Sequence, residues 1–326
     1  MVLTNNAVMD RIRASAAGSY DAGVFELTFQ AMATRCRVSL GASATEAKAF
    51  AGKVLEWVAG FEARYSRFIG DSLVSRINEA AGSEWVTIDP ETERIFALCG
   101  ELHFITRGVF DPTALPLIKL WDWKAGVVPA DAAIAGALEL VGWRKVQRAP
   151  GRIFLPRKGM AIDLGGIGKE YAVDCVVEMA KGRGIRSVLV DFGQDVRVQG
   201  APPDRRSVWH IGLEDPKHPG RCWAGLGVKD GAVATSGDYV RHFQSGGRRY
   251  GHILDVRTGR PVANGCRAVS VMASNCTYAG ALSTTAFVLG ADEGLKLLDA
   301  TYQAEGCITT DTGKFPSRRF YEHVVS

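Results

Sequence analysis

The stretch "AIDLGGIGKEYAVDCVVEMAKGRG", residues 161–184, decides the fold prediction because an apolar strand pattern changes to a helical pattern within a few residues. Gly165 and Gly166 predict a turn between the two elements. The free N–H groups at the start of such a helix can bind an anion, and Lys169 in its first turn would add positive charge. The spacing matches neither a P-loop nor a dinucleotide fingerprint, so a plain strand-to-helix turn is the alternative.

The sequence on both sides of this stretch predicts helices and strands that do not alternate strictly. Helical spacing of apolar residues predicts helices at 46–68, 92–108, 131–142, 277–290 and 293–300. Strand patterns occur at 24–40, 185–193, 209–215, 225–237, 267–274 and 304–313. This mixture favours an α+β fold in one compact unit over residues 25–326. Residues 1–24 are polar and rich in small side chains, and we expect them to be flexible.

The predicted helix "TYAGALSTTAFVLG", residues 277–290, contains an unexpected glycine. Its apolar residues recur at steps of three or four, which predicts an amphipathic helix that ends at Gly290. A glycine inside a helix costs about 1 kcal/mol relative to alanine, yet Gly280 lies in the interior. Thr284 follows four residues later, so both positions share one face of the helix.

Composition and charge exclude several classes of function. The net charge of +4 over 326 residues, without a long Lys/Arg run, argues against a nucleic-acid-binding protein. No apolar stretch approaches the length of about 18 residues that a membrane span needs, and the first residues lack the apolar segment of a secretory signal. The seven cysteines are widely spaced and form no C-x-x-C motif, which argues against disulfides or a zinc site. We therefore expect a cytoplasmic protein.

Three further stretches contain groups that can perform chemistry or bind a ligand. In "GHILDVRTGRPV", residues 251–262, His252 and Asp255 precede a polar turn, and a histidine at a strand end can act as a general acid or base. In "AVATSGDYVRHF", residues 232–243, hydroxyl and N–H groups can bind an anion or a ring edge. Simple hydrogen-bonded turns are the alternative for both stretches. The tryptophans of "FDPTALPLIKLWDW", residues 110–123, either cover a planar ligand or cap a core.

Taken together and in this order, the motifs resemble the FAD:protein FMN transferase family, the ApbE-like flavin transferases. The resemblance extends from about residue 30 to the C-terminus. It rests on "MATRCRV", "RYSRFIGDSLVSRIN", "FDPTALPLIKLWDW", "IDLGGIGKEYAVD", "LVDFGQDVRVQG", "AVATSGDY", "HILDVRTGRPV" and "AGALSTTAFVLG". It implies an α+β, ApbE-like (T-fold-related) unit with FAD in a cleft between two lobes and magnesium on the FAD pyrophosphate. It further implies that FMN moves from FAD to a Ser or Thr hydroxyl of a partner flavoprotein, or that FAD is hydrolysed to FMN and AMP.

The resemblance also implies roles for individual residues. His252 matches the family histidine beside the pyrophosphate and Asp255 follows it, which makes them the catalytic candidates. Thr284 matches the hydroxyl ligand of the metal, and Gly166 occupies the position whose backbone carbonyl is a ligand. The implied FAD-binding residues are Gly165, Gly166, Lys169, Asp174, Thr235, Ser236, Gly237, Asp238, His252, Arg257 and Thr258.

The departures from the family pattern concentrate at this implied site. In the family pattern Ala-Asp-Ala-Leu-x-Thr the Asp is the carboxylate ligand of the metal, and here Gly280 stands in its place, so Mg²⁺ binding should be weak or lost. The family Lys-Gly is Lys169-Glu170, and Asp191 stands where the family has Asn, which brings two acidic groups near the pyrophosphate unless they face elsewhere. Two hypotheses stay open: a transferase with a weakened metal site, or a flavin-binding protein that has lost this chemistry. The acceptor protein and the oligomeric state are also open.

Overall fold

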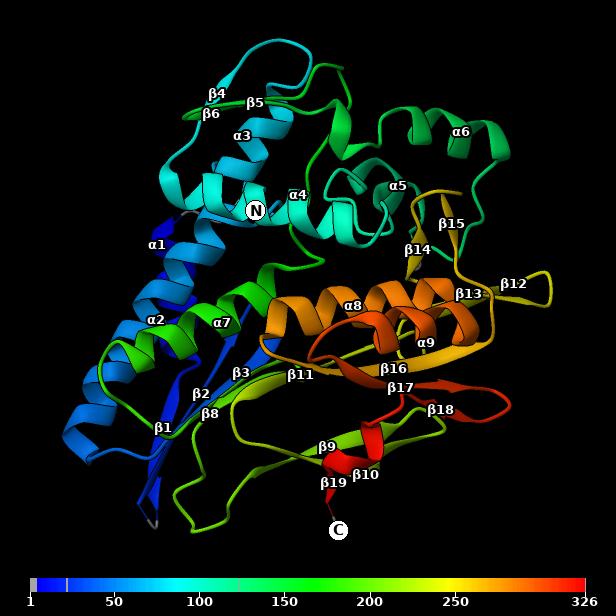
Figure 1. The fold of residues 1–326 in the computed structure, drawn as a ribbon. Helices are drawn as coiled ribbons and strands as arrows, with labels where there is room; N and C mark the ends of the chain where they lie inside the picture. The colour runs from blue at the N-terminus through cyan, green and yellow to red at the C-terminus, as the bar shows by residue number, and fades with distance from the viewer. Residues whose placement is uncertain (1–4, 22, 123, 326) are drawn as a thin grey trace.

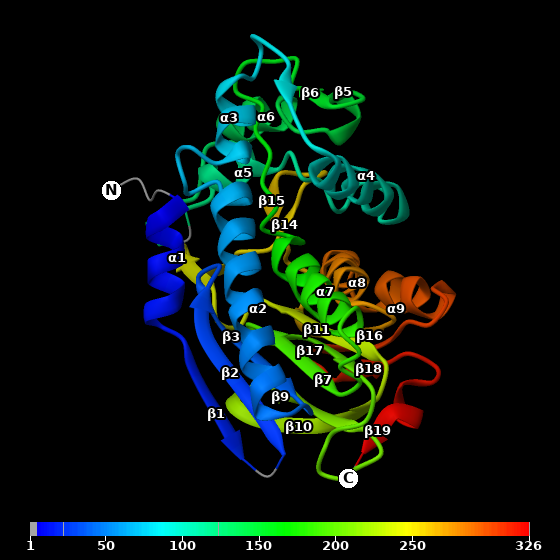
Figure 2. The same ribbon diagram turned by 90° about the vertical axis from the view of Figure 1, so that its left-hand side faces the viewer.

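The computed structural model describes residues 5–21, 23–122 and 124–325, which form a mixed helix and sheet unit with two lobes (Figures 1 and 2). The larger lobe is built on a nine-stranded antiparallel sheet with the strand order β1-β2-β3-β7-β8-β11-β16-β17-β18. Its strands are β1 (Ala17–Asp21), β2 (Val24–Ala31), β3 (Thr34–Leu40), β7 (Val188–Phe192), β8 (Asp195–Gln199), β11 (Gly231–Gly237), β16 (Cys266–Ala273), β17 (Glu305–Thr310) and β18 (Lys314–Pro316). The predicted α+β class is confirmed.

Helices cover one face of this sheet and a small sheet covers the other (Figure 1). The helices are α2 (Ala44–Tyr65), α7 (Gly168–Lys181), α8 (Cys276–Leu289) and α9 (Ala291–Ala300). The small sheet consists of β9 (Trp209–Asp215), β10 (His218–Val228) and β19 (Val324–Val325). Leu189, Val196 and Val198 of the large sheet pack against Trp209, Ile211 and Leu226 of the small one, so the middle of the large sheet is buried on both faces, while its edge strand β1 is exposed.

The second lobe stands above α7 and α8 in Figure 1 and consists mainly of short elements. They are α3 (Leu73–Glu79), α4 (Pro90–Ile105), α5 (Leu115–Leu120), α6 (Asp131–Glu139), β4 (Val86–Thr87), β5 (Gln147–Ala149), β6 (Arg152–Phe154) and the 3₁₀ turn Trp143–Lys145. The hairpins β12 (His242–Ser245) with β13 (Arg248–Gly251) and β14 (Leu254–Asp255) with β15 (Arg260–Pro261) link the two lobes. A second 3₁₀ turn, Phe320–His323, precedes β19.

The helix α8 occupies the centre of the molecule. It ends at Gly290, whose φ of 85° suits glycine, as predicted. Eleven of its 14 residues are buried, so the expectation of an amphipathic helix with one apolar face is wrong. The reason is that α8 contacts β11, β16, α7 and α9 at once, and a helix enclosed by neighbours needs no polar face.

The N-terminal segment, where it is described, is ordered, which corrects the expectation of a flexible region over residues 1–24. Helix α1 (Asn5–Ala14) packs on α2, and its side chains Val8 and Ile12 are fully buried. Strand β1 then pairs with β2 along its whole length. Two apolar side chains one turn apart are enough to anchor the helix, although its composition is polar. Residues 1–4 and 22 lie outside the described residues.

The segment before the glycine turn is extended but belongs to no sheet, so the strand predicted at its start is wrong. The side-chain amide of Asn78 accepts a hydrogen bond from the backbone N–H of Ile162 at 2.6 Å and donates one to its carbonyl at 2.9 Å. The N–H of Asp163 donates to the carbonyl of Pro112 at 2.8 Å. Because a side chain and a loop satisfy these backbone groups, the apolar segment needs no neighbouring strand.

Within the described residues, no helix is both long enough and apolar enough to cross a membrane. Five of the seven cysteines are buried and all are free thiols, as their apolar surroundings in the sequence suggested. The cytoplasmic location stays a prediction.

The packing of α1 predicts the effect of truncating its buried side chain. Replacing Ile12 by alanine removes a fully buried side chain, and such a change lowers the free energy of unfolding by about 2–5 kcal/mol. Asp10 lies on the exposed side of the same helix, so Asp10→Ala should change it by less than about 0.5 kcal/mol. Urea denaturation of the three proteins measures this, and equal midpoints for all three would contradict the docking of α1.

Candidate active site

Helices α7 and α8 are joined by the carboxylate of Asp174. It accepts hydrogen bonds from the N–H groups of Cys276 at 2.8 Å and Thr277 at 2.9 Å, and from the Thr277 hydroxyl at 2.6 Å. Arg197 on β8 binds the same carboxylate at 3.0 Å. The free N–H groups and the helix dipole at the start of α8 favour a negative charge there. Asp174, expected to bind FAD, thus has its carboxylate engaged in holding the two helices together.

One turn closer to the start of α7, Glu170 faces Gly280 of α8. A Cβ atom built on Gly280 would lie 2.8 Å from Cγ of Glu170 and 3.0 Å from its Oε1. Glu170 is 8% exposed, and its Oε2 has no hydrogen-bond partner. Burial raises the pKa of Glu170 to about 7, against the attraction of Lys169. The side chain of Glu170 therefore fills the space that a side chain at position 280 would take.

Lys169 is paired with two carboxylates. Its ammonium forms a short hydrogen bond with Oδ2 of Asp195 and lies 3.9 Å from Oε1 of Glu170. Burial alone would lower the pKa of Lys169, but the attraction of Glu170 and Asp195 raises it above its usual value, so the side chain stays charged. Burial raises the pKa of Asp195 despite Lys169.

A cluster of hydroxyl groups joins the end of β11 to α8. The Ser236 hydroxyl is 2.8 Å from the Ser283 hydroxyl and 2.7 Å from that of Thr284. Thr235, its neighbour on β11, pairs instead with the hydroxyl of Ser270 at 2.8 Å. Thr284 lies one turn beyond Gly280, so Ser236 and Thr284 adjoin the pair formed by Glu170 and Gly280. We call Lys169, Glu170, Ser236, Gly280 and Thr284 the α7–α8 site.

The next residues of the predicted FAD loop face the β12–β13 hairpin. Asp238 is buried, with Arg249 at 3.2 Å and Arg267 at 3.8 Å from its carboxylate oxygens. Burial raises the pKa of Asp238 against the attraction of Arg267. A Cβ on Gly251 would lie 2.9 Å from Cβ of Asp238, and one on Gly237 would lie 3.0 Å from a backbone carbonyl. The approach of Gly251 to Asp238 brings the segments 235–238 and 251–258 side by side, whereas the carbonyl near Gly237 belongs to Arg267 of β16.

His252 directly follows β13, and its geometry suits a base. Both its backbone N–H, at 3.1 Å, and its ring Nδ1, at 3.2 Å, are bonded to the carbonyl of Arg241. A carbonyl only accepts, so Nδ1 carries the hydrogen and Nε2 of the neutral ring keeps its lone pair. Burial lowers the pKa of His252 although the bond to Arg241 opposes the shift, so the ring is neutral at pH 7.

Asp255 shapes the turn after His252 and does not orient the ring directly. Its carboxylate accepts hydrogen bonds from the backbone N–H and the guanidinium of Arg257 at 2.8–3.0 Å. Burial would raise the pKa of Asp255, but the bonds from Arg257 hold it below its usual value. Its carbonyl accepts from the N–H groups of Thr258 at 3.1 Å and Gly259 at 2.8 Å. Arg257 and Thr258, both expected to bind FAD, are thus part of the hydrogen bonding of this turn.

The same turn is attached to the second lobe. Trp121 Nε1 donates to the carbonyl of Gly259 at 2.7 Å, and its ring stacks on Tyr250 of β13. Trp121 is 6% exposed and therefore caps a core, which was the second of the two roles considered for it. Trp123 lies outside the described residues.

The glycine turn lies before α7, as predicted. The N–H of Gly165 donates to the carboxylate of Asp163 at 3.1 Å, and Gly166 packs beside the ring of Phe110. Asp191, by contrast, faces away from the α7–α8 site, because its carboxylate binds Arg37 on β3 at 3.3 Å and the N–H of Gln194 at 2.9 Å. Of the two additional acidic residues, only Glu170 belongs to the site.

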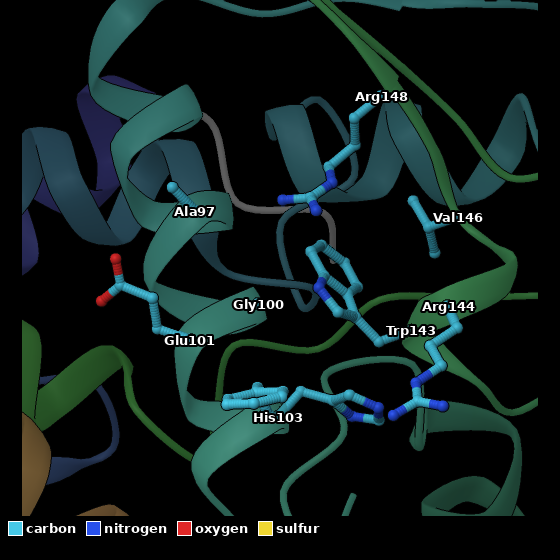
Figure 3. Close-up of a pocket in the computed structure, with 9 residues that line it drawn as sticks. Ala97, Gly100, Glu101, His103, Trp143, Arg144, Val146 and Arg148 are labelled. Atoms are coloured by element: carbon cyan, nitrogen blue, oxygen red, sulfur yellow. The ribbon is translucent and has the colours of Figure 1, made fainter.

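Two cavities of the described structure lie away from the α7–α8 site and from His252. One of 570 Å³ lies between α4 and the segment 143–148, where Figure 3 shows Trp143, His103 and Arg148 around it. One of 530 Å³ lies beside Trp57 and Tyr171. Asp174 is the one predicted site residue that lines either of them, so neither cavity traces the predicted FAD cleft.

The contacts that Glu170 and Asp195 make are not evident from the sequence pattern. In the sequence, Glu170 indicates only added negative charge, and no motif distinguishes Asp195. One signal was available for Glu170: the sequence has a larger residue than the family at position 170 and a smaller one at position 280. When two side chains are in contact, a larger residue at one position requires a smaller residue at the other, so that the total volume stays the same.

Comparison with known proteins assigns the chain to a family. The sequence model of the ApbE family matches residues 32–308. A FAD:protein FMN transferase of Vibrio cholerae is 30% identical over 241 residues, which cover 72% of this chain and 72% of that protein. One of Treponema pallidum is 33% identical over 248 residues, covering 70% of this chain and 68% of the other.

Solved structures agree with the sequence comparison. The ApbE protein of Thermotoga maritima superposes with a TM-score of 0.85 at 31% identity, over 93% of this chain and 100% of that one. The flavin transferase ApbE of Vibrio cholerae superposes with a TM-score of 0.82 at 26% identity, over 94% and 99%. From the family match, these relatives and the shared fold, we conclude that the chain belongs to the ApbE family.

Proposed function

We propose that the protein is a FAD:protein FMN transferase, which moves FMN from FAD to a Ser or Thr hydroxyl of an acceptor flavoprotein. The observation that carries the proposal is that Glu170, next to Lys169 at the start of α7, lies beside Gly280 of α8. Thr284 follows Gly280 by one turn, and its hydroxyl pairs with that of Ser236 on β11. Three segments implied to bind FAD or metal thus come together, in a chain whose relatives are named for this activity.

The reaction replaces the phosphoanhydride bond of FAD by a phosphate ester bond to the acceptor. The acceptor hydroxyl oxygen forms a bond to the phosphorus of the FMN half of FAD, and the bond from that phosphorus to the AMP oxygen breaks. The hydroxyl proton must go to a base, and AMP leaves with the electron pair of the broken bond. Water in place of the acceptor gives FMN and AMP.

His252 is our candidate for the base. Its Nε2 carries a free lone pair at neutral pH, because Nδ1 donates to Arg241 and burial keeps the ring uncharged. Asp255 acts indirectly, because it fixes the turn that follows His252 rather than the ring itself. The positively charged Lys169 can attract the negative pyrophosphate toward the start of α7.

The donor atoms of the α7–α8 site fit a magnesium ion. Mg²⁺ prefers oxygen ligands and binds through one or two carboxylates together with substrate phosphates. The Thr284 hydroxyl and a buried, unpaired carboxylate oxygen of Glu170 are donors of this type, and the carbonyl of Gly166 remains a predicted third. Within the described part of the chain, no group of three or more His, Cys, Asp or Glu side chains is arranged to bind a metal. When bound, the ion would neutralise charge on the pyrophosphate.

The alternative of a flavin-binding protein without transferase chemistry has no observation in its favour. It was suggested by Gly280, and the structure places a carboxylate beside that glycine.

Binding of FAD is the first outcome that we predict. Titrating the protein into FAD should quench the flavin fluorescence with a saturable curve and a Kd below tens of micromolar. The same preparation should release AMP from FAD, measured by chromatography, and faster when an acceptor protein is present. A linear titration without saturation, with and without magnesium, would overturn the flavin assignment itself.

Removing the proposed base should reduce turnover and leave binding in place. His252→Ala should slow AMP release by about 10²–10⁴-fold, as expected for loss of a general base, with the Kd for FAD nearly unchanged. His210→Ala is the matched control, because His210 is exposed on β9, on the other side of the large sheet. Equal rates for both variants would exclude His252 as the base.

The pH dependence of the wild-type rate tests the same assignment. The pKa of His252 is lowered from 6.5, so the neutral, active ring persists below that pH. AMP release should therefore be constant near pH 7 and fall only as the pH drops below 6.5, where the ring becomes protonated. A fall in rate that begins above pH 7 on acidification would contradict the lowered pKa.

A further inference from the structure

The carboxylate of Glu170 lacks a partner for one of its oxygens. Glu170 is 8% exposed, and its Oε2 is buried without a hydrogen bond, while its Oε1 lies 3.9 Å from Lys169. Burying a carboxylate oxygen without a partner is unfavourable relative to exposing it to water. The chain places this group inside the protein and provides it with no second donor among its described atoms, which is the arrangement expected of a ligand-binding oxygen.

The charges around Glu170 do not cancel. Lys169 is shared with Asp195, which it contacts more closely than Glu170. Asp174, one turn along α7, is itself balanced by Arg197. When both carboxylates are ionised, Glu170 and Asp195 with one lysine between them leave one negative charge, which a bound cation would balance.

The carboxylate of Glu170 adjoins the face of α8 that carries a hydroxyl donor. Position 280 has no side chain, and the Glu170 carboxylate occupies the space beside its Cα. Thr284 follows one turn later on α8, and its hydroxyl pairs with that of Ser236. A carboxylate and hydroxyl groups from two helices and a strand end are hard oxygen donors, which suit Mg²⁺ or Mn²⁺ rather than a softer metal.

We propose that Glu170 is the carboxylate ligand of the divalent cation and that it works from α7 in place of the side chain that Gly280 lacks on α8. On this proposal the site keeps a carboxylate ligand, and Gly280 by itself does not weaken metal binding. The cation's part in FMN transfer rests on the proposed function, but its binding to Glu170 can be measured without any turnover.

The proposal can be tested by moving the carboxylate between position 170 on α7 and position 280 on α8. Glu170→Gln keeps the shape of the side chain and removes its charge, and Glu178→Gln is the matched control because Glu178 is an exposed glutamate on the same helix. Gly280→Asp adds a second carboxylate in a crowded place, because a Cβ at position 280 would lie 2.8 Å from Cγ of Glu170. The double variant Glu170→Gly with Gly280→Asp moves the carboxylate from one helix to the other.

The measurement is the electron paramagnetic resonance signal of free Mn²⁺ titrated into each protein with FAD, alongside a thermal melt that confirms folding. Glu170→Gln should weaken Mn²⁺ binding by about tenfold or more, and Glu178→Gln should leave it unchanged. Gly280→Asp alone should lower the melting temperature without tightening Mn²⁺ binding. The double variant should bind Mn²⁺ within about threefold of the wild type and melt above Gly280→Asp.

Three results would overturn the proposal. They are unchanged Mn²⁺ affinity in Glu170→Gln, tighter binding in Gly280→Asp than in the wild type, and a folded double variant that does not bind. None of them touches the transferase assignment, which stands or falls on AMP release by the wild type. Conversely, a wild type that binds Mn²⁺ through Glu170 and releases no AMP would overturn the proposed function and leave the metal ligand in place.

Discussion

The contact between Asp174 and the start of α8 is the constraint on which the site depends. Its carboxylate satisfies N–H groups that the helix itself cannot pair and binds Arg197 of β8 on its other side. This fixes the position of α7 along α8. Glu170 precedes Asp174 by one turn, and Gly280 follows Cys276 by one turn, so the same register places Glu170 opposite Gly280. The contact of Asp174 with the start of α8 thus aligns Glu170 with Gly280 in the candidate site.

The site also depends on how the second lobe is attached. The extended segment that leads to the glycine turn is held by the Asn78 amide, and the turn after His252 is held by Trp121. Both contacts use backbone groups of the site segments and side chains of the second lobe. The start of α7 and the segment around His252 therefore come from different parts of the chain but are fixed by the same lobe, which favours a constant geometry between them.

Much of the fold could be predicted because its signals are local. The helices at 46–68 and 277–290 and the strands at 24–40 follow from apolar spacing, and Gly290 ends its helix because glycine adopts a positive φ without strain. The errors occurred where distant residues decide. Two buried side chains anchor α1, and Asn78 replaces the missing strand partner of Ile162. Neither partner can be identified from the local pattern.

The sequence by itself determined the order of the motifs, and with it the family and the position of the glycine turn, His252 and Thr284 along the chain. Against the family pattern that the resemblance implies, it also showed that position 280 lacks a carboxylate and position 170 carries one. Only the tertiary structure decided that these two changes belong together, that Asp191 faces Arg37, and that Asp174 holds α8. The physical reason is that local patterns fix which groups a segment carries. The space and the charge that a buried group meets are fixed by the segment packed against it, which here lies more than a hundred residues away.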